Sequence, residues 1–180
     1  MTADGTAVRP ATPGEVDAAV AVWRAANEAR TGGPPDPPEV EAMVRGWIAA
    51  PDAMLFVAER GGRIIGMTLA VAGREVNGTS PAAPNGRIIA GLCHVSLVFV
   101  APDVWGQGIG SRLLDAVLDE ASQQGYLRAQ LWTHETNVRA RRLYVSRQFA
   151  LTGDRAVNPA GETIMRFERP LERAHPGSRR

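Results

Sequence analysis

Glycines at every second position, Gly106, Gly108 and Gly110, follow an apolar strand and precede an amphipathic helix. Such a layout turns bare backbone N–H groups and a helix N-terminus toward one point, where anions bind. The spacing does not fit the dinucleotide fingerprint Gly-x-Gly-x-x-Gly, and a Walker loop requires a lysine. All 20 basic side chains are arginine, so the lysine of Schiff-base and pyridoxal enzymes is also absent. The loop therefore predicts a phosphate-bearing cofactor.

Two segments carry a resemblance to a known family. The loop Gly106–Ser111 behind its strand resembles the pyrophosphate loop of the GNAT superfamily, the acetyl-CoA-dependent N-acetyltransferases. The segment from Asn137 to Tyr144, followed by Phe149, resembles the family's second conserved region, with asparagine, alanine, leucine and tyrosine on a helix. The resemblance covers about residues 8–169. An ordinary glycine-rich strand-to-helix turn is the alternative interpretation of the loop alone.

The resemblance implies which residues hold acetyl-CoA. Loop N–H groups would bind the pyrophosphate, because glycine lets the backbone approach closely, and a strand edge would pair with the pantetheine arm. The family usually has glutamine or arginine at the position of Trp105, so this side chain departs from the motif. Plain sheet core is the alternative for the strand, and a helix N-cap is the alternative for Asn137. The expected cofactor-binding residues are Val98, Phe99, Val100, Trp105, Gly106, Gln107, Gly108, Ile109, Gly110, Ser111 and Asn137.

Acetyl transfer to an amine requires a neutral amine, donors for the oxyanion of a tetrahedral intermediate and a proton for the departing thiolate. The resemblance places Tyr144 beside the CoA sulfur as general acid, with a core tyrosine as the alternative. His94 lies on the strand that enters the site, and the usual pKa of histidine suits a general base. A packed strand histidine is its alternative. His134, Glu135 and Glu75 are weaker candidates for the base, and a water chain could replace a single base.

The composition excludes several classes of protein. Cys93 is the single cysteine, which excludes an internal disulfide and fits a reducing compartment. No cysteine–histidine–aspartate arrangement supports covalent catalysis, and no metal-ligand spacing is present, so no metal is expected. A net charge of +1 predicts no nucleic-acid or membrane partner. Without a signal-peptide pattern or a membrane-spanning apolar run, a soluble cytoplasmic protein is expected.

The elements that position these residues follow from local patterns. Thr12–Glu15 is a capping box that starts a helix, and a second helix is predicted from Asp36. A Gly61-Gly62 turn predicts a hairpin between two strands. The expected order, β-α-α-β-β-β-α-β-α-β-β, gives an α+β fold with a mixed, mostly antiparallel sheet and helices on both faces. The expected strands are 6–9, 54–59, 63–71, 92–100, 127–133, 149–152 and 163–168; the later helices are 109–121 and 137–147; a long connection covers 73–87.

The family resemblance adds two expectations about this fold. The central strands 92–100 and 127–133 would splay apart, and acetyl-CoA would enter between them. The chain is expected to form one acetyl-CoA-binding domain over residues 1–170, followed by a disordered tail over 171–180.

The sequence thus predicts an enzyme that moves the acetyl group of acetyl-CoA directly to a primary amine. The acceptor is expected to be a small molecule or a peptide amine. The segments 30–36, 73–90 and 158–161 would shape its binding site. In protein N-terminal acetylases of the family a glutamate tends to occupy the position of Trp132, which argues against that substrate class. A non-catalytic acyl-CoA-binding sensor or regulatory module is the alternative function, hydrolysis of acyl-CoA is a third, and a homodimer is left open.

Overall fold

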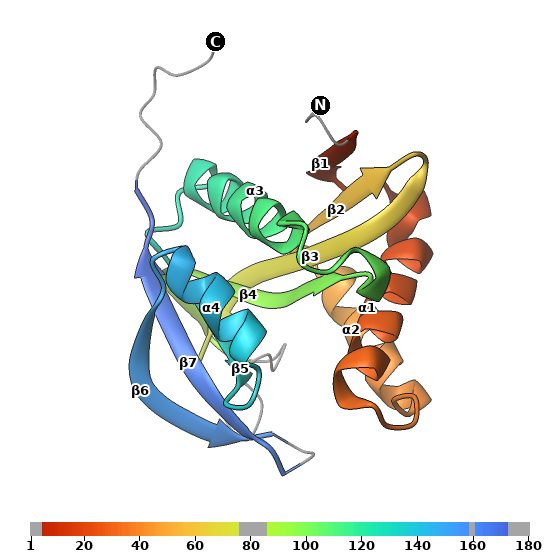
Figure 1. Cartoon of the computed structure of the whole chain (residues 1–180). Coiled ribbons are helices and arrows are strands. Elements are labelled where there is room, and N and C mark those ends of the chain that lie inside the picture. The colour runs from red at the N-terminus through yellow and green to blue at the C-terminus, as the bar shows by residue number, and fades with distance from the viewer. Residues whose placement is uncertain (1–4, 76–85, 159–160, 173–180) are drawn as a thin grey trace. The chain divides into compact units, whose positions relative to one another are not determined.

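The computed structural model describes residues 5–75, 86–158 and 161–172, and its elements follow the predicted order (Figure 1). The strands are β1 (Thr6–Pro10), β2 (Met54–Arg60), β3 (Arg63–Arg74), β4 (Ile88–Val100), β5 (Arg128–His134), β6 (Ala150–Val157) and β7 (Thr163–Pro170). The helices are α1 (Val16–Thr31), α2 (Pro38–Ile48), α3 (Ile109–Gln123) and α4 (Val138–Ser146), with short 3-10 turns η1 (Pro13–Glu15) and η2 (Pro102–Val104). Most of the predicted long connection and of the expected tail lies outside the described residues.

The described strands form a mixed, mostly antiparallel sheet of seven strands in the order β1-β2-β3-β4-β5-β7-β6. Strands β4 and β5 are parallel, whereas β1–β2, β2–β3, β5–β7 and β6–β7 are antiparallel. This arrangement confirms the α+β fold and the antiparallel bias expected from the sequence.

The parallel β4–β5 pair is short. Its register joins Leu92–Val95 to Arg128–Leu131 and ends there. Strand β4 continues to Val100, and strand β5 continues to His134. The two strands predicted to splay therefore stop pairing before either of them ends.

The chain divides into two compact units, and β3, β4 and α3 each run through both. Unit 1 comprises Met1–Val71 and Leu97–Val117, and unit 2 comprises Ala72–Ser96 and Leu118–Arg180. Each unit has its own share of the predicted site residues. The prediction of one domain over residues 1–170 stays a prediction.

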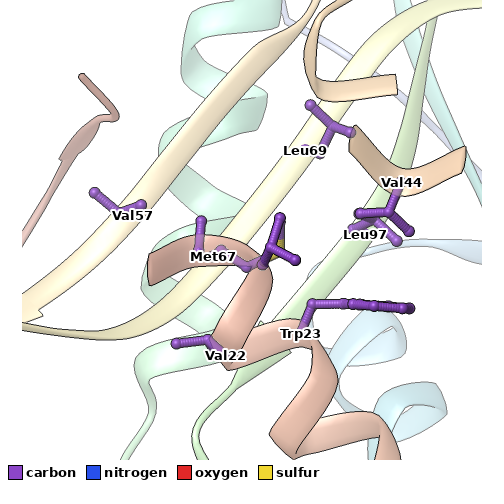
Figure 2. Packing of buried hydrophobic residues seen from close by; sticks show 9 residues of the cluster. Val22, Trp23, Val44, Val57, Met67, Leu69 and Leu97 are labelled. Carbon is purple, nitrogen blue, oxygen red and sulfur yellow. The ribbon is translucent and has the colours of Figure 1, made fainter. Parts of the chain in front are cut away.

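An apolar cluster fills the core of unit 1 between its helices and its strands (Figure 2). Trp23 of α1 and Val44 of α2 meet Met67 and Leu69 of β3, and all four side chains are buried. Apolar residues at helical spacing turn one face of α1 and α2 toward the sheet.

Helix α3 packs on the other face of β3. A Cβ on Gly66 would lie 2.8 Å from Leu113 Cδ1 and 3.2 Å from Ile109 Cγ2. Glycine at this position of β3 therefore lets α3 approach the strand closely. This contact fixes the start of α3, where the predicted phosphate loop ends.

The capping box predicted at the start of α1 is present, and it is tied to β1. Glu15 Oε2 accepts a hydrogen bond from Thr12 N at 2.8 Å, and Arg9 Nη2 donates to Glu15 Oε1 at 2.5 Å. The hydrogen bond from Arg9, followed by that from Thr12, lowers the pKa of Glu15 to about 2. The box opens the 3-10 turn η1, and α1 follows it directly.

The structure corrects several predicted boundaries: β3 ends at Arg74 rather than at residue 71, and β6 ends at Val157 rather than at residue 152. Helix α2 begins at Pro38 rather than at Asp36, because the Asp36 carboxylate accepts a hydrogen bond from the Asn27 side chain and does not cap the helix. Strand β4 begins at Ile88, four residues before its predicted start. Glu75 N donates to the carbonyl of Arg87 at 2.9 Å, which extends the ladder between β3 and β4.

In unit 2, α4 lies beside the β5–β7 pair (Figure 1). Its Tyr144 contacts Phe167 of β7. Strand β6 is the edge strand of the sheet, and its residues are exposed or half-buried. Its register with β7 shifts between Leu151 and Arg155, where Gly153 has a φ of 91°. This bulge lies opposite the part of β7 that faces Trp132 of β5.

Candidate functional site

The loop between β4 and α3 turns on two glycines with positive φ. The φ angle is 84° at Gly106 and 76° at Gly108, a region that other residues avoid. A Cβ at either position would meet nothing within 4 Å. Glycine is therefore required by the backbone conformation and not by protein packing, and the space beside both glycines is open.

Backbone N–H groups of this loop are left for a ligand. In the described part of the chain, the N–H groups of Gly106, Gln107 and Gly108 donate to no protein group. The first turn of α3, which begins at Ile109, leaves its own N–H groups without intrahelical acceptors and carries the positive end of the helix dipole. This arrangement fits a pyrophosphate.

Two side chains of the loop hold the loop itself. Trp105 Nε1 donates to the carbonyl of Val100 at 2.7 Å and closes the junction between β4 and the loop. Gln107 Oε1 accepts from Arg60 Nη1 at 2.9 Å. The tryptophan that departs from the family motif thus has a structural role in the loop.

The strand segment Val98–Val100 belongs to unit 1 and is held next to β3. Thr68 Oγ1 donates to the carbonyl of Leu97 at 2.9 Å, and Ala101 N donates to the carbonyl of Ile65 at 2.9 Å. Phe99 packs against the apolar cluster of Figure 2. The sheet-core role of this segment is therefore present, and its pairing with pantetheine stays a prediction.

Tyr144 lies in an aromatic cluster of unit 2. Its ring meets Phe149 edge-on at 6.1 Å between centroids and meets Phe167 at 6.3 Å. The residue is 7% exposed, and burial raises the pKa of its phenol to about 12. No hydrogen bond joins its hydroxyl to another group in the described part of the chain. The phenol is thus protonated at neutral pH and free to donate to a ligand.

His94 is buried in the sheet of unit 2. The residue is 4% exposed, and its Nδ1 has no hydrogen-bond partner in the described part of the chain. Burial lowers the pKa of the imidazole to about 4. His94 is therefore neutral at pH 7, and it is a weaker base than the usual histidine assumed from the sequence.

The strand register shows which faces His94 and Tyr144 use. His94 pairs with Gln130 of β5, so these two side chains share one face of the sheet. Leu131, the next residue of β5, pairs with Phe167 on the opposite face, and Phe167 is the residue that Tyr144 contacts. His94 and Tyr144 therefore lie on opposite faces of the sheet of unit 2.

Asn137 is the N-cap of α4, which is the alternative role weighed for it. Its Oδ1 accepts from Ala140 N at 3.1 Å. The amide nitrogen of Asn137 has no hydrogen bond to the described residues. The cap uses one end of the amide, and the other end is available to a ligand.

Each of the weaker base candidates has a charged neighbour. The Glu75 carboxylate is hydrogen-bonded to Arg87, which lowers the pKa of Glu75. Glu135 meets Arg155 at 3.1 Å, and His134 Nδ1 lies 3.2 Å from a carboxylate oxygen of Glu162. These contacts favour a role in holding the surface.

Cys93 is fully buried, and burial raises the pKa of its thiol to about 12. The thiol is therefore protonated at neutral pH, which argues against a nucleophile. In the described ranges no group of three or more His, Cys, Asp or Glu side chains is placed to hold a metal ion. None of the helices within these ranges has the length and apolar character needed to cross a membrane.

A surface hollow of about 680 Å³ lies in unit 1 between α1 and the β2–β3 turn. Small side chains of α1, Ala18, Ala21 and Ala25, line one wall, and Arg63 and Ile64 line the other. None of the predicted site residues lines it, so the hollow is separate from the chemistry considered above.

Sequence reasoning missed a second buried polar atom. Trp132 Nε1 is buried without a hydrogen-bond partner in the described part of the chain. Trp132 lies two residues after Gln130 on β5, so both side chains point to the face of His94. Strict alternation along β5 was the available signal, but the strand register was needed to relate β5 to β4.

Comparisons with known proteins agree with this fold. A model of the acetyltransferase (GNAT) family matches residues 19–149. Over 49 residues the chain is 43% identical to an uncharacterized N-acetyltransferase of Archaeoglobus fulgidus. That match covers 27% of this chain and 33% of the relative, so it spans about a third of the relative's length.

Solved structures of similar fold cover nearly all of the chain. The ribosomal-protein-S18-alanine N-acetyltransferase of Escherichia coli superposes with a TM-score of 0.70 at 17% identity, over 97% of this chain and 99% of that one. The PaiA N-acetyltransferase of Thermoplasma acidophilum, solved with coenzyme A, gives a TM-score of 0.64 at 16% identity, over 89% and 97%. At these identities the likeness concerns the fold alone.

Proposed function

Because the chain belongs to the acetyltransferase (GNAT) family, we propose that it transfers the acetyl group of acetyl-CoA directly to the amine of a small-molecule or peptide acceptor. The observation that carries this proposal is the loop from Gly106 to Gly108, with open space and unused N–H groups at the N-terminus of α3. A neutral donor array of this kind suits a pyrophosphate. A cytoplasmic location and the oligomeric state stay predictions.

Three parts of the site would hold acetyl-CoA under this proposal. The loop Gly106–Ser111 binds the pyrophosphate through its backbone, while Trp105 keeps the loop attached to β4. The edge of Val98–Val100 and the free amide nitrogen of Asn137 bind the pantetheine arm. Acetyl-CoA supplies the activated thioester, and the protein supplies position and protons.

Tyr144 and His94 would act separately in the reaction. Tyr144, protonated at neutral pH, donates to the sulfur of the leaving thiolate. His94, neutral and buried, accepts a hydrogen bond from the incoming amine. Because the attacking nitrogen and the leaving sulfur bond to the same carbonyl carbon, the proposal requires that carbon to lie where β4 and β5 stop pairing, between the two faces that carry His94 and Tyr144.

The enzyme proposal is tested by thiol release from acetyl-CoA in the presence of a pool of amines. Steady release that requires an amine supports acetyl transfer, and release without any amine indicates hydrolysis. Binding of CoA without thiol release indicates a sensor module. The low pKa of His94 and the pairing of Glu75 with Arg87 would favour this alternative, because they leave two weaker bases. Since the chain contains no lysine, self-acetylation adds background only at the α-amino group.

Replacing Gly108 by valine is expected to weaken CoA binding about 10- to 100-fold, because it disturbs N–H donors to a charged group. The substitution also strains the backbone at a φ of 76°, at a cost of about 1–2 kcal/mol of stability. Isothermal titration calorimetry with CoA measures the affinity. Gly125→Val is the matched control, because Gly125 has a φ of 88° and equally open surroundings but lies after α3. Equal affinities in the two folded variants would refute the loop assignment.

The pH–rate profile is expected to lack an inflection at the usual pKa of histidine. A group that accepts a proton must be unprotonated, and His94 stays unprotonated down to about pH 4. Between pH 6 and 8 the rate should therefore rise only with the unprotonated fraction of the acceptor amine. Profiles of kcat/KM for the wild type and His94→Gln check this. An inflection near pH 6.5 that disappears in the variant would contradict the buried neutral state.

A further inference from the structure

Apart from His134, whose Nδ1 lies 3.2 Å from Glu162, two side chains of unit 2 have a buried polar atom without a hydrogen-bond partner in the described residues. The two atoms are Nδ1 of His94 and Nε1 of Trp132. An unpaired buried polar atom costs free energy, and folded proteins rarely keep one unless water or a ligand satisfies it. A pair of such atoms on one surface is therefore a candidate site for a ligand from outside the chain.

Both atoms belong to side chains on the same face of the sheet. His94 of β4 lies beside Gln130 of β5, and Trp132 is two residues further along β5. Diagonal neighbours of this kind are roughly 7–8 Å apart on a sheet face, a gap that a molecule of a few atoms can bridge. Gln130, which is 3% exposed, lies beside His94 and two residues before Trp132 on the same face.

Trp132 also stands where β4 and β5 separate. The last residue pair between these strands is Val95 with Leu131, and Trp132 is the next residue of β5. On its other side β5 remains paired, with Trp132 opposite Arg166 of β7. The indole thus lies at the first position where β5 is no longer covered by a strand partner on the β4 side.

The charged neighbours on this face lie in pairs, and the titratable His134, two residues after Trp132, lies 3.2 Å from Glu162. Arg166 Nη2 meets Asp154 Oδ2 at 2.5 Å beside the β6 bulge, and Arg128 meets Glu168 at 3.0 Å. Because each of these charges is paired, neither pair offers a free carboxylate or a free guanidinium to a ligand next to Trp132. The subsite consists of a neutral N–H donor and a neutral imidazole.

We propose that Trp132 determines acceptor specificity, its indole N–H binding an oxygen beside the acceptor's amine while His94 Nδ1 accepts from that amine. The acceptors that fit are α-amino acids and their amides, in which nitrogen and oxygen lie a few bonds apart. Simple alkylamines and polyamines lack the oxygen. This inference rests on the proposed acetyl transfer, and it identifies the substrate class of the same site.

The activity test compares three amines that share a side chain: L-phenylalanine, L-phenylalaninamide and 2-phenylethylamine. Trp132→Phe keeps an aromatic ring and removes only the N–H donor. The variant should lose about 10- to 100-fold in kcat/KM with the two oxygen-bearing amines and change less than about twofold with 2-phenylethylamine. The amine whose kcat/KM falls more in the variant, L-phenylalanine or L-phenylalaninamide, carries the oxygen that Trp132 prefers. An equal loss for all three, or no loss, overturns the proposal.

A second readout does not depend on turnover. The indole N–H of Trp132 gives its own signal in a ¹H–¹⁵N spectrum, identified by its absence in Trp132→Phe. With CoA present throughout, adding either oxygen-bearing amine should shift this signal, and 2-phenylethylamine should not. The Trp105 indole, bonded to the carbonyl of Val100, is the internal reference. If no amine increases thiol release from acetyl-CoA, acetyl transfer is rejected, but the subsite is not. If the Trp132 signal does not move, the subsite is rejected.

Discussion

Replacing Tyr144 by phenylalanine is expected to lower kcat about 10²–10⁴-fold, the usual contribution of general acid catalysis. Only the hydroxyl is removed, and the ring contacts with Phe149 and Phe167 remain. Because the hydroxyl has no hydrogen bond within the described residues, its loss should hardly change thermal stability or the affinity for acetyl-CoA. Steady-state kinetics, calorimetry and thermal unfolding measure the three quantities.

Tyr126→Phe is the matched control, because Tyr126 is the other tyrosine of the chain and lies just after α3. Its kcat should stay near that of the wild type. The pH dependence gives a further check, since a general acid must be protonated and the pKa of Tyr144 is raised to about 12 by burial. Activity should therefore show no loss from Tyr144 up to about pH 10. Wild-type turnover in Tyr144→Phe would make the residue structural and leave the thiolate to water.

The glycine turn between β4 and α3 could be predicted from the sequence because its requirement is local. Positive φ angles at Gly106 and Gly108 need glycine, and an apolar strand before the loop and an amphipathic helix after it fix its place. The capping box from Thr12 to Glu15 was predictable for the same reason. In each case the residues that make the interaction are neighbours in the chain.

The faces and environments of the catalytic candidates could not be predicted, because they depend on register. A shift of one residue moves a side chain to the other face of a sheet, so His94 could have faced either side. Only its pairing with Gln130 places it opposite Tyr144, and only the surrounding sheet buries it. The low pKa follows from that burial. The unpartnered indole of Trp132 was missed for the same reason.

Boundaries were wrong where a distant side chain competed with a local signal. Asp36 has the residue type of an N-cap, but its carboxylate is bound by Asn27 of α1, and α2 begins at Pro38. The early start of β4 depends on pairing with β3 next to Glu75 and Arg87. Long-range contacts of this kind leave no pattern in a short window of sequence.

Burial of His94 also predicts how stability depends on pH. Unfolded, the imidazole has its ordinary pKa of 6.5, and folded it has a pKa of about 4. Between these values the unfolded chain binds a proton that the folded chain excludes, so the free energy of unfolding must fall as the pH falls. Across about 2.5 pH units, at about 1.4 kcal/mol each, the loss is roughly 3 kcal/mol. Above pH 6.5 and below pH 4, His94 does not change the free energy of unfolding further as the pH changes.

The test measures the free energy of unfolding by urea titration between pH 4.5 and 7.5 for the wild type and for His94→Gln. Glutamine does not titrate, so the variant should lose most of the slope in this window even if its overall stability is lower. Carboxylates such as Glu15, whose pKa is lowered to about 2, lose their stabilising effect at lower pH and affect both proteins alike. His134→Gln, at a half-buried position beside Glu162, should keep the His94 slope. Parallel pH curves for the wild type and His94→Gln would show that folding does not shift the pKa of His94, which would contradict the lowered pKa expected from its burial.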